Sequence, residues 1–352
     1  MKLAFSGSKP LDLKLGMMGS SKFLPENPKK EKIIVIMGAT GSGKSRLSID
    51  LATRFSPCEI INSDKMQLYR GLDITTNKIP MHERLGIPHH LIDEFDPADG
   101  ELSASDFRSL AASAVSEISS RNHLPILVGG SNSFIHAFLT DQFESDSDGS
   151  SSSLDSFESV SAELRYDCCF IWIDVSLPVL KEYLSLRVDQ MLESGMFEEL
   201  AEFYESESSI TNSDIASAHR IGIRKSIGVA EFQRFFRFFP PPRMGLSGGK
   251  GCIGSGEMMG LMEDTRLEAD VSRRMLFEEA VQAIKDNSYE LAKRQVGKIK
   301  RLRSAGWDIK RLNATEVFRA VLMDPGRKSS DIWEKEIVES SVKFVKQFLL
   351  SL

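Results

Sequence analysis

A glycine-rich run near the start of the chain carries the clearest chemical pattern in the sequence. Residues 38–45 fit G-x-x-x-x-G-K-[ST] with Gly38, Ala39, Thr40, Gly41, Ser42, Gly43, Lys44 and Ser45. The run lies between a continuous apolar segment, residues 33–37, and a stretch with apolar residues at helical spacing. That strand-and-helix context is what a P-loop requires, because the loop and the helix N-terminus then point their N–H groups at an anion. The pattern therefore predicts a phosphate-binding site, with a tightly packed turn as the alternative.

Two side chains of the run add chemistry to the loop. Lys44 supplies a mobile positive charge, and the hydroxyl of Ser45 can ligate Mg²⁺. Most P-loops hold a nucleoside triphosphate, so an NTPase or small-molecule kinase is the default class of function.

Two aspartates follow predicted strands directly. Asp64 comes after the strand-like residues 59–61, and Asp174 ends the apolar segment 169–173. Ligands bind at the carboxyl ends of parallel strands, so a carboxylate there can contact a magnesium ion or act as a general base. For Asp64 the alternative is a helix cap or a surface acid. Asp174 resembles a Walker-B acid and keeps the kinase alternative open.

The elements that must position these residues alternate between strands and helices. Further buried strands are predicted at residues 125–128 and 169–173, and a helix begins where Ser103 and Asp106 are spaced as a capping box. Apolar stripes predict helices over residues 180–191 and 274–303, and residues 307–312 predict a returning edge strand. The expected fold is an α/β, P-loop NTPase-like parallel sheet flanked by helices, with a helical C-terminal subdomain and the active site in the cleft between them.

The domain boundaries follow from these elements. We expect a disordered extension or transit segment at 1–30, a P-loop core at 31–175 and a helical substrate subdomain at 176–305. In the helical subdomain, residues 239–262 are expected to form a flexible insertion of Pro, Gly, Met and Ser. In the P-loop core, residues 144–162 are expected to form a Ser- and acid-rich loop. Residues 306–352 return a strand to the core and add a C-terminal helix.

Composition narrows the class of protein. The 352 residues carry a formal charge of −6, which argues mildly against bulk nucleic-acid binding. No apolar run reaches the roughly 18 residues of a membrane span. The four cysteines have neither a disulfide nor a zinc-site spacing, as expected for a reducing compartment. We expect a monomer.

Seven blocks in order resemble the isopentenyltransferases that prenylate the N6 amine of adenine. They are residues 38–45, 62–78, 86–93, 127–134, 165–175, 222–232 and 292–299. The residues CCFIWIDV and the lack of a zinc-finger pattern near the C-terminus are similar to the plant adenylate branch. The resemblance covers about residues 32 to 313, without the two insertions.

This resemblance implies a different use of the P-loop. It would hold the diphosphate of dimethylallyl diphosphate with Mg²⁺ as cofactor, while the N6 amine of AMP, ADP or ATP attacks C1 of the prenyl chain. The expected product begins the synthesis of isopentenyladenine-type cytokinins. The resemblance also implies a plastid location, with the cytoplasm as the alternative. A tRNA dimethylallyltransferase, a P-loop kinase or NTPase, and a non-catalytic nucleotide-binding module remain as alternatives.

The resemblance assigns roles to individual residues. Asp64 aligns with the catalytic base, and Ser131 with a hydroxyl residue near the diphosphate or the reacting amine. Arg224 is expected to clamp the diphosphate, since a guanidinium can bind phosphate oxygens in pairs. Arg187 lies beside the apolar face of its helix, where either an anionic ligand or a buried salt bridge would satisfy its charge. Lys293 and Arg294 are expected along the path of the nucleotide phosphates, with a solvated helix face as the alternative.

Other conspicuous residues favour plain structural roles. His89 and His90 lack carboxylate or cysteine partners at ligand spacing, so we expect structure or substrate lining instead of metal binding. Trp172 and Trp307 are expected to pack in the core or at a domain interface. The phenylalanines between residues 232 and 239 are expected to pack, because few basic residues accompany them.

Overall fold

A computed structural model describes residues 30–141, 163–208, 221–241, 259–324 and 326–351. The chain divides into two units, Met1–Lys30 and Glu31–Leu352, and the description below concerns the second unit. All of the predicted loop at 144–162 lies outside the described residues, as do Cys252 and most of the predicted insertion at 239–262.

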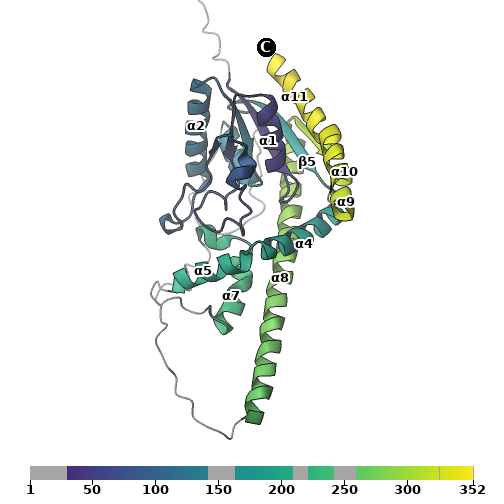
Figure 1. The fold of residues 1–352 in the computed structure, drawn as a ribbon. Coiled ribbons are helices and arrows are strands. Elements are labelled where there is room, and N and C mark those ends of the chain that lie inside the picture. Colours follow the sequence, from purple (N-terminus) through teal and green to yellow (C-terminus); the bar gives the residue numbers. More distant parts are fainter. Residues whose placement is uncertain (1–29, 142–162, 209–220, 242–258, 325, 352) are drawn as a thin grey trace, which may run out of the picture. The chain divides into compact units, whose positions relative to one another are not determined.

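A parallel sheet of six strands forms the centre of the fold (Figure 1). Its strands are β1 (Lys32–Gly38), β2 (Cys58–Asn62), β3 (His89–His90), β4 (Leu124–Val128), β5 (Asp167–Asp174) and β6 (Ile309–Asn313). The strand order is β3-β2-β4-β1-β5-β6, and every pairing is parallel. β1 lies near the middle, so the loop that follows it emerges between the ends of β4 and β5.

Helices connect and flank the strands. They are α1 (Lys44–Arg54), α2 (Ala104–Ser120), α3 (Asn132–Leu139), α4 (Leu177–Glu193), α5 (Met196–Ser208), α7 (Val229–Phe238), α8 (Met259–Ser304), α9 (Thr315–Met323), α10 (Arg327–Ile332) and α11 (Glu339–Leu350). Short 3₁₀ turns occur at Met81–Arg84, Pro97–Asp99 and Gly222–Lys225, and a π-helical stretch at Trp333–Val338 joins α10 to α11. α1 packs against β1, β2 and β4, while α8 reaches both β1 and α3.

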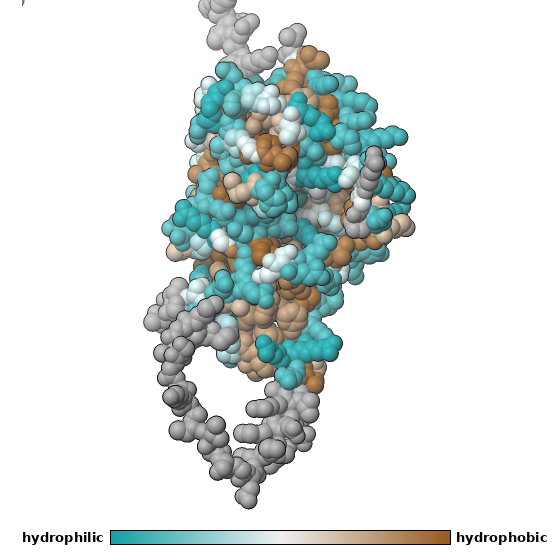
Figure 2. Space-filling view, viewed as in Figure 1, coloured by the Kyte–Doolittle hydropathy of each residue, from teal (hydrophilic) through white to brown (hydrophobic). Residues whose placement is uncertain are grey.

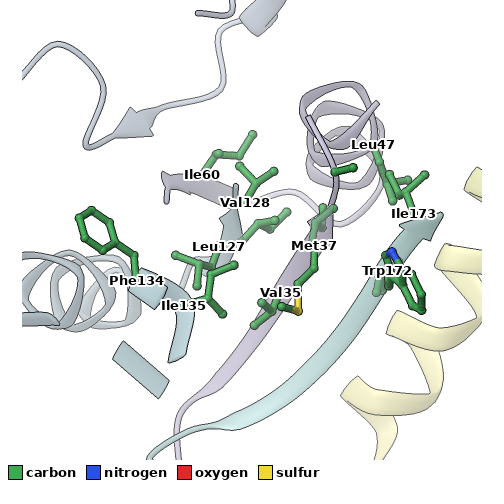
Figure 3. Packing of buried hydrophobic residues seen from close by; sticks show 14 of the residues in the cluster. Val35, Met37, Leu47, Ile60, Leu127, Val128, Phe134, Ile135, Trp172 and Ile173 are labelled. Carbon is green, nitrogen blue, oxygen red and sulfur yellow. The ribbon is translucent and has the colours of Figure 1, made fainter. Parts of the chain in front are cut away.

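The core is built where the strands are apolar on both faces. Residues 33–37 of β1 have no exposed surface, and Ile60, Leu127 and Ile171 in neighbouring strands are equally buried. Figure 3 shows Leu47 of α1 and Phe134 of α3 packing around these strands. A continuous buried run on a central parallel strand requires cover on both faces. The core thus fixes β1 and α1, and with them the ends of the loop between them.

The aromatic residues predicted to pack do so, except Phe238, which is 63% exposed because it lies on the outer face of α7. Trp172 and Trp307 are 2% and 3% exposed. Phe232, Phe235 and Phe236 of α7 are buried and meet the ring of Phe197 at centroid distances of 5.4–5.5 Å. In Figure 2 hydrophobic residues gather over the part of the molecule around α7 and α8.

The predicted strands, including the returning edge strand, are confirmed, as is the capping box of Ser103 and Asp106 at the start of α2. The predicted start of the last long helix was wrong. α8 begins at Met259, inside the segment predicted to be a flexible insertion, and not near Arg274. Sequence periodicity missed the first turns because their run of Met, Gly and Leu has no clear polar face. No helix in the described part of the chain combines the length and apolar character that a membrane span needs.

Candidate active site

A cavity of about 620 Å³ lies at the carboxyl ends of β1, β2 and β4. Parts of the P-loop form one side of it, and the residues after β2 and β4 form another. α4 and α8 contribute the remaining walls. The topology explains the position, since the ends of neighbouring parallel strands face the same edge of the sheet.

The P-loop enters the cavity with its lysine and serine. Thr40, Gly41, Gly43, Lys44 and Ser45 line the cavity. Gly43 takes a φ of 90°, a left-handed conformation that favours glycine, immediately before α1 begins. The turn therefore directs the N-terminus of α1, with its unpaired N–H groups, at the cavity. Gly38, Ala39 and Ser42 shape the loop without lining the cavity; the ammonium of Lys44 donates to the carbonyl oxygen of Ala39 at 2.7 Å.

Lys44, Asp64 and Arg187 all line this cavity and influence one another electrostatically. Burial lowers the pKa of Lys44 to about 8; the carboxylate of Asp64 opposes that shift and the guanidinium of Arg187 adds to it. Burial raises the pKa of Asp64 above its usual 3.8, against the opposing effects of Lys44, the Met66 N–H and Arg187. Two cations face one carboxylate, so the site carries an excess of positive charge for an anionic ligand.

Asp64 is held in place by its neighbours in the turn after β2. The Asn62 side-chain oxygen accepts from the Asp64 N–H at 3.0 Å, and the Asn62 amide donates to the carbonyls of Asp64 and Leu91. One carboxylate oxygen of Asp64 accepts from the Met66 N–H at 3.1 Å. The Gln67 N–H also favours the charged carboxylate, and Asp64 lines the cavity, where it can accept a proton from a ligand.

Ser131 is tied to the same turn. Its hydroxyl accepts from the Lys65 N–H at 3.0 Å, and Ser131 lines the cavity beside Gly129. Lys65 directly follows Asp64, so the structure brings the predicted hydroxyl residue and the predicted base together.

Arg187 reaches the P-loop from α4. Its guanidinium donates to the Thr40 hydroxyl at 3.2 Å, while its Nε is buried without a hydrogen-bond partner. Within the described residues no carboxylate lies at ion-pair distance from it, and burial lowers its pKa. Of the two alternatives left open by the sequence, this arrangement favours an anionic ligand over a salt bridge, because a buried arginine needs a counter-charge.

Gln295 of α8 joins two sides of the cavity, and sequence analysis did not single it out. Its side-chain oxygen accepts from the Thr40 N–H of the P-loop at 2.7 Å, and its amide donates to the Gly130 carbonyl at 3.0 Å. Gln295 is 8% exposed and lines the cavity. The only signal in the sequence was its place in the block 292–299. Asn62 was missed too, although an Asn two residues before an Asp, directly after a strand, is typical of a side-chain-to-backbone turn.

The other predicted cationic residues divide between the cavity and its surroundings. Arg294 lines the cavity, whereas Lys293 pairs with Glu290 at 2.6 Å on the surface of α8. Arg224 is not brought to the cavity; its Nε and one terminal nitrogen, Nη2, donate to the carboxylate of Glu207. Its neighbour Lys225 lines the cavity instead.

Asp174 does not face the cavity. Its carboxylate accepts from the Arg311 guanidinium at 2.6 and 2.7 Å, and it is absent from the lining. Both bonds reach one oxygen, Oδ2, and hold the carboxylate in an ion pair across β5 and β6. The position that kept the kinase alternative open is therefore structural.

The two adjacent histidines have different surroundings. His89 lines the cavity, whereas the His90 ring is hydrogen-bonded to the carboxylate of Glu59 at 2.6 Å. Glu59 also bonds Arg121 and His123, and these bonds lower its pKa to about 2 although burial acts to raise it. The described residues contain no group of three or more His, Cys, Asp or Glu arranged to hold a metal ion.

A parallel sheet with a P-loop at its carboxyl edge, two buried cations and a carboxylate defines a P-loop α/β enzyme. Comparison with known proteins identifies the family of this enzyme. The IPP transferase family matches residues 67–159 and 148–301. An adenylate isopentenyltransferase of Humulus lupulus is 58% identical over 315 residues, covering 89% of each chain.

Further relatives agree with this match. Adenylate isopentenyltransferase 8, chloroplastic, of Arabidopsis thaliana is 50% identical and covers 92% of this chain and 88% of its own. A eukaryotic dimethylallyltransferase acting on tRNA has the same fold, with a TM-score of 0.66 at 24% identity, over 91% of this chain and 79% of that one. The chain belongs to the IPP transferase family, and it is a prenyltransferase.

Proposed function

We propose that this enzyme transfers the dimethylallyl group of dimethylallyl diphosphate to the N6 amine of AMP, ADP or ATP, as in cytokinin synthesis. The observation that carries the proposal is the single cavity that joins a P-loop and Arg187 to a carboxylate with a raised pKa. The names of the relatives, adenylate isopentenyltransferases, support the choice of substrates.

The cationic side of the cavity suits the donor diphosphate. Lys44, Arg187 and the N–H groups at the start of α1 neutralise the charge that grows on the leaving group. In the transfer the N6 nitrogen forms a bond to C1 of the prenyl chain, and the C1–O bond breaks. The electron pair of that bond leaves with the diphosphate.

Mg²⁺ fits this side of the cavity as a partner of the diphosphate. The Ser45 hydroxyl lines the cavity next to Lys44, and Mg²⁺ characteristically binds one or two protein oxygens together with substrate phosphates and water. When bound it would add positive charge at the departing diphosphate.

Asp64 suits the acceptor. The exocyclic amine of adenine must lose a proton as its nitrogen bonds to carbon, and the carboxylate of Asp64 accepts that proton. Its raised pKa makes it a stronger base than an ordinary aspartate. Ser131 lies close enough to Asp64 to orient the amine or a diphosphate oxygen.

Apolar residues complete the site. Val188 and Met191 of α4 and Ile284 and Leu291 of α8 line the cavity between the polar groups. Such a lining accommodates the five-carbon prenyl chain and keeps water from the reacting carbon, which would otherwise be hydrolysed.

Plastid location is part of the proposal. Several Arabidopsis relatives are named chloroplastic, and one at 39% identity is named mitochondrial. Expression of the full chain with a C-terminal fluorescent tag in plant cells distinguishes plastid from cytoplasm.

An acceptor panel tests the activity. The protein is incubated with dimethylallyl diphosphate and Mg²⁺ plus AMP, ADP, ATP or an unmodified tRNA with A37, and products are identified by mass. We expect N6-prenylated nucleotides. Prenylation of the tRNA alone would overturn the proposal in favour of a tRNA enzyme, and phosphate release from ATP without prenylation would favour a kinase or NTPase.

A further inference from the structure

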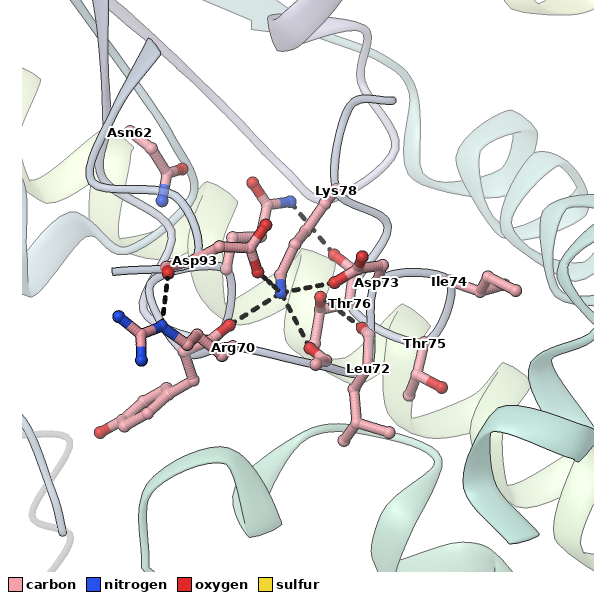
Figure 4. A network of polar contacts seen from close by, with 12 residues as sticks. Asn62, Arg70, Leu72, Asp73, Ile74, Thr75, Thr76, Lys78 and Asp93 are labelled. Atoms are coloured by element: carbon pink, nitrogen blue, oxygen red, sulfur yellow. Dashed lines mark hydrogen bonds and ion pairs between the residues drawn. The ribbon is translucent and has the colours of Figure 1, made fainter. Parts of the chain in front are cut away.

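Lys78 is a buried cation that no part of the proposed chemistry uses. Its side chain is 3% exposed, and its ammonium donates to the carbonyl oxygens of Tyr69 and Gly71 at 2.7 and 2.8 Å. It also pairs with the carboxylates of Asp73, at 2.8 Å, and Asp93. Figure 4 shows these oxygens converging on the lysine nitrogen. Lys78 therefore ties two separated stretches of the chain, residues 69–73 and Asp93, to one point.

The segment between residues 67 and 79 is held from a second side by α5. The carboxylate of Glu199 accepts from the N–H groups of Ile74 and Thr75 at 2.9 and 2.8 Å, and from the Thr75 hydroxyl at 2.6 Å. The Gln67 amide closes the segment on itself by donating to the carbonyls of Thr76 and Asn77 at 3.1 Å. A connection without helix or strand thereby gains a fixed shape.

The fixed segment is a wall of the cavity. Gln67, Thr75, Thr76, Asn77 and Ile79 all line it, whereas Lys78 does not. These lining groups are neutral amides, hydroxyls and one apolar side chain. The segment between residues 67 and 79 adds no cation to the lining of the cavity. Phosphate calls for cations, whereas neutral donors and acceptors match the edges of a heterocycle or sugar.

We infer that Lys78 is a positioning residue that shapes the acceptor side of the cavity for the base and ribose of the nucleotide. The inference rests on the proposed function. Without the ammonium, the carboxylates of Asp73 and Asp93 repel each other, and two carbonyl groups lose their donor. The wall shifts, while the P-loop keeps its own contacts to Gln295 and Arg187.

Steady-state kinetics with both substrates test the inference. In Lys78→Met we expect the KM for ATP and AMP to rise by about tenfold or more, a loss of at least about 1.4 kcal/mol in nucleotide binding. The KM for dimethylallyl diphosphate should stay within about twofold of the wild type, because the donor binds the other side. Lys310→Met is the matched control, since Lys310 forms an exposed pair with Asp308, and both its KM values should be unchanged.

Glu199→Gln is a second variant, which weakens the hydrogen bonds between α5 and the same wall of the cavity. It tests the inference if Lys78→Met does not fold. It should raise the nucleotide KM selectively as well. An equal rise in both KM values, or a fall in kcat with both KM values unchanged, would show that Lys78 and Glu199 act only on general stability and would overturn the inference. Failure of the wild type to prenylate any nucleotide would instead count against the proposed function.

Discussion

At the scale of single residues, the site depends on Lys44 and Asp64 sharing a poorly solvated space. Burial favours the neutral form of each group, lowering the pKa of the lysine and raising that of the aspartate. Each charge opposes the shift in the other group, which favours the state with a protonated lysine and an ionised aspartate. In the proposed reaction that state lets the lysine attract the diphosphate and the carboxylate accept a proton.

Replacing the base should stop the chemistry without emptying the site. In Asp64→Asn we expect kcat to fall by about 10²–10⁴-fold, since the amide cannot accept the N6 proton. Affinity for dimethylallyl diphosphate, measured by calorimetry, should be nearly unchanged. Asp174→Asn is the matched control, because Asp174 pairs with Arg311 away from the cavity. Near-normal kcat in Asp64→Asn would remove Asp64 as the base.

The same pair of groups predicts a bell-shaped pH profile of kcat/KM. As pH falls through the raised pKa of Asp64, its carboxyl is protonated and can no longer act as a base. As pH rises through about 8, Lys44 loses the proton that gives it its charge. Lys44→Arg keeps a positive charge at every pH, so its alkaline limb should move upward by more than one pH unit. An unchanged alkaline limb in this variant would show that another group titrates there.

The residues in the P-loop and Asp64 could be predicted because motif and strand end placed them at one edge of the sheet. Ser131 was predicted from the family resemblance, and Arg187 from its charge beside the apolar face of a helix. Arg294 was predicted and lines the cavity, but Lys293 and Arg224 do not. Neighbouring residues on a helix or turn point in different directions, and only the packed structure shows that Glu290 and Glu207 lie beside these two. Gln295 was missed because its partners are backbone groups, which leave no pattern in the sequence. Lys78 was missed because only the fold brings two carbonyl groups and the carboxylates of Asp73 and Asp93 together around it.

At the scale of elements, α8 connects the P-loop with the loop after β4. A Cβ atom on Gly130 would lie 2.4 Å from the amide nitrogen of Gln295, so only glycine leaves room for this contact. The positions of donor and acceptor groups are coupled through this one side chain.

Gly130→Ala should therefore displace Gln295 and lower kcat/KM by about tenfold or more, as expected when groups in an active site are misplaced by about 1 Å. Gly297→Ala is the matched control. Gly297 lies on the same helix, its added Cβ would meet nothing within 4 Å, and alanine should stabilise the helix by about 0.5–1 kcal/mol. Thermal unfolding and steady-state kinetics of both variants give the comparison. Full activity of Gly130→Ala would show that the Gln295 contact is dispensable.

The network around Glu59 joins β2, β3 and the end of α2, away from the chemistry. Its folded pKa of about 2 lies below the usual 4.5, so it stabilises the fold above pH 4.5 and loses that effect as pH falls toward 2. The difference between these two pKa values corresponds to about 3 kcal/mol of folding free energy. The partners of Glu59 are partly exposed, so screening by solvent reduces this contribution to about 2 kcal/mol. Urea unfolding should show Glu59→Gln less stable by about this amount at pH 7, with a smaller deficit at pH 4. An equal deficit at both values would contradict this origin.

Most strands could be predicted from the sequence because continuous apolar runs between turn residues are distinctive. The start of α8 could not be predicted, since residues 259–262, Met-Gly-Leu-Met, contain no polar side chain that would mark one face of a helix. The two-residue strand β3 is too short to leave a pattern, and it forms only because β2 offers it a free edge.

At the scale of the whole molecule, the net charge and the charge of the cavity differ in sign. The chain has a formal charge of −6, while the cavity collects Lys44, Arg187, Lys225 and Arg294. An acidic protein with a cationic cavity favours a small anionic nucleotide over a polyanion that must cover a wide surface. The sequence alone could not show this contrast, because it depends on which charges the fold brings together.

The central claim is that the P-loop holds the diphosphate of the prenyl donor and that the nucleotide is the acceptor. Dimethylallyl diphosphate labelled with ³²P in its diphosphate, incubated with unlabelled ATP, Mg²⁺ and the enzyme, tests this directly. We predict that the label leaves as free diphosphate, in equal amount to an N6-dimethylallyl-ATP that keeps its three phosphates. Label that remains on the prenyl compound while ATP loses its terminal phosphate would contradict the account.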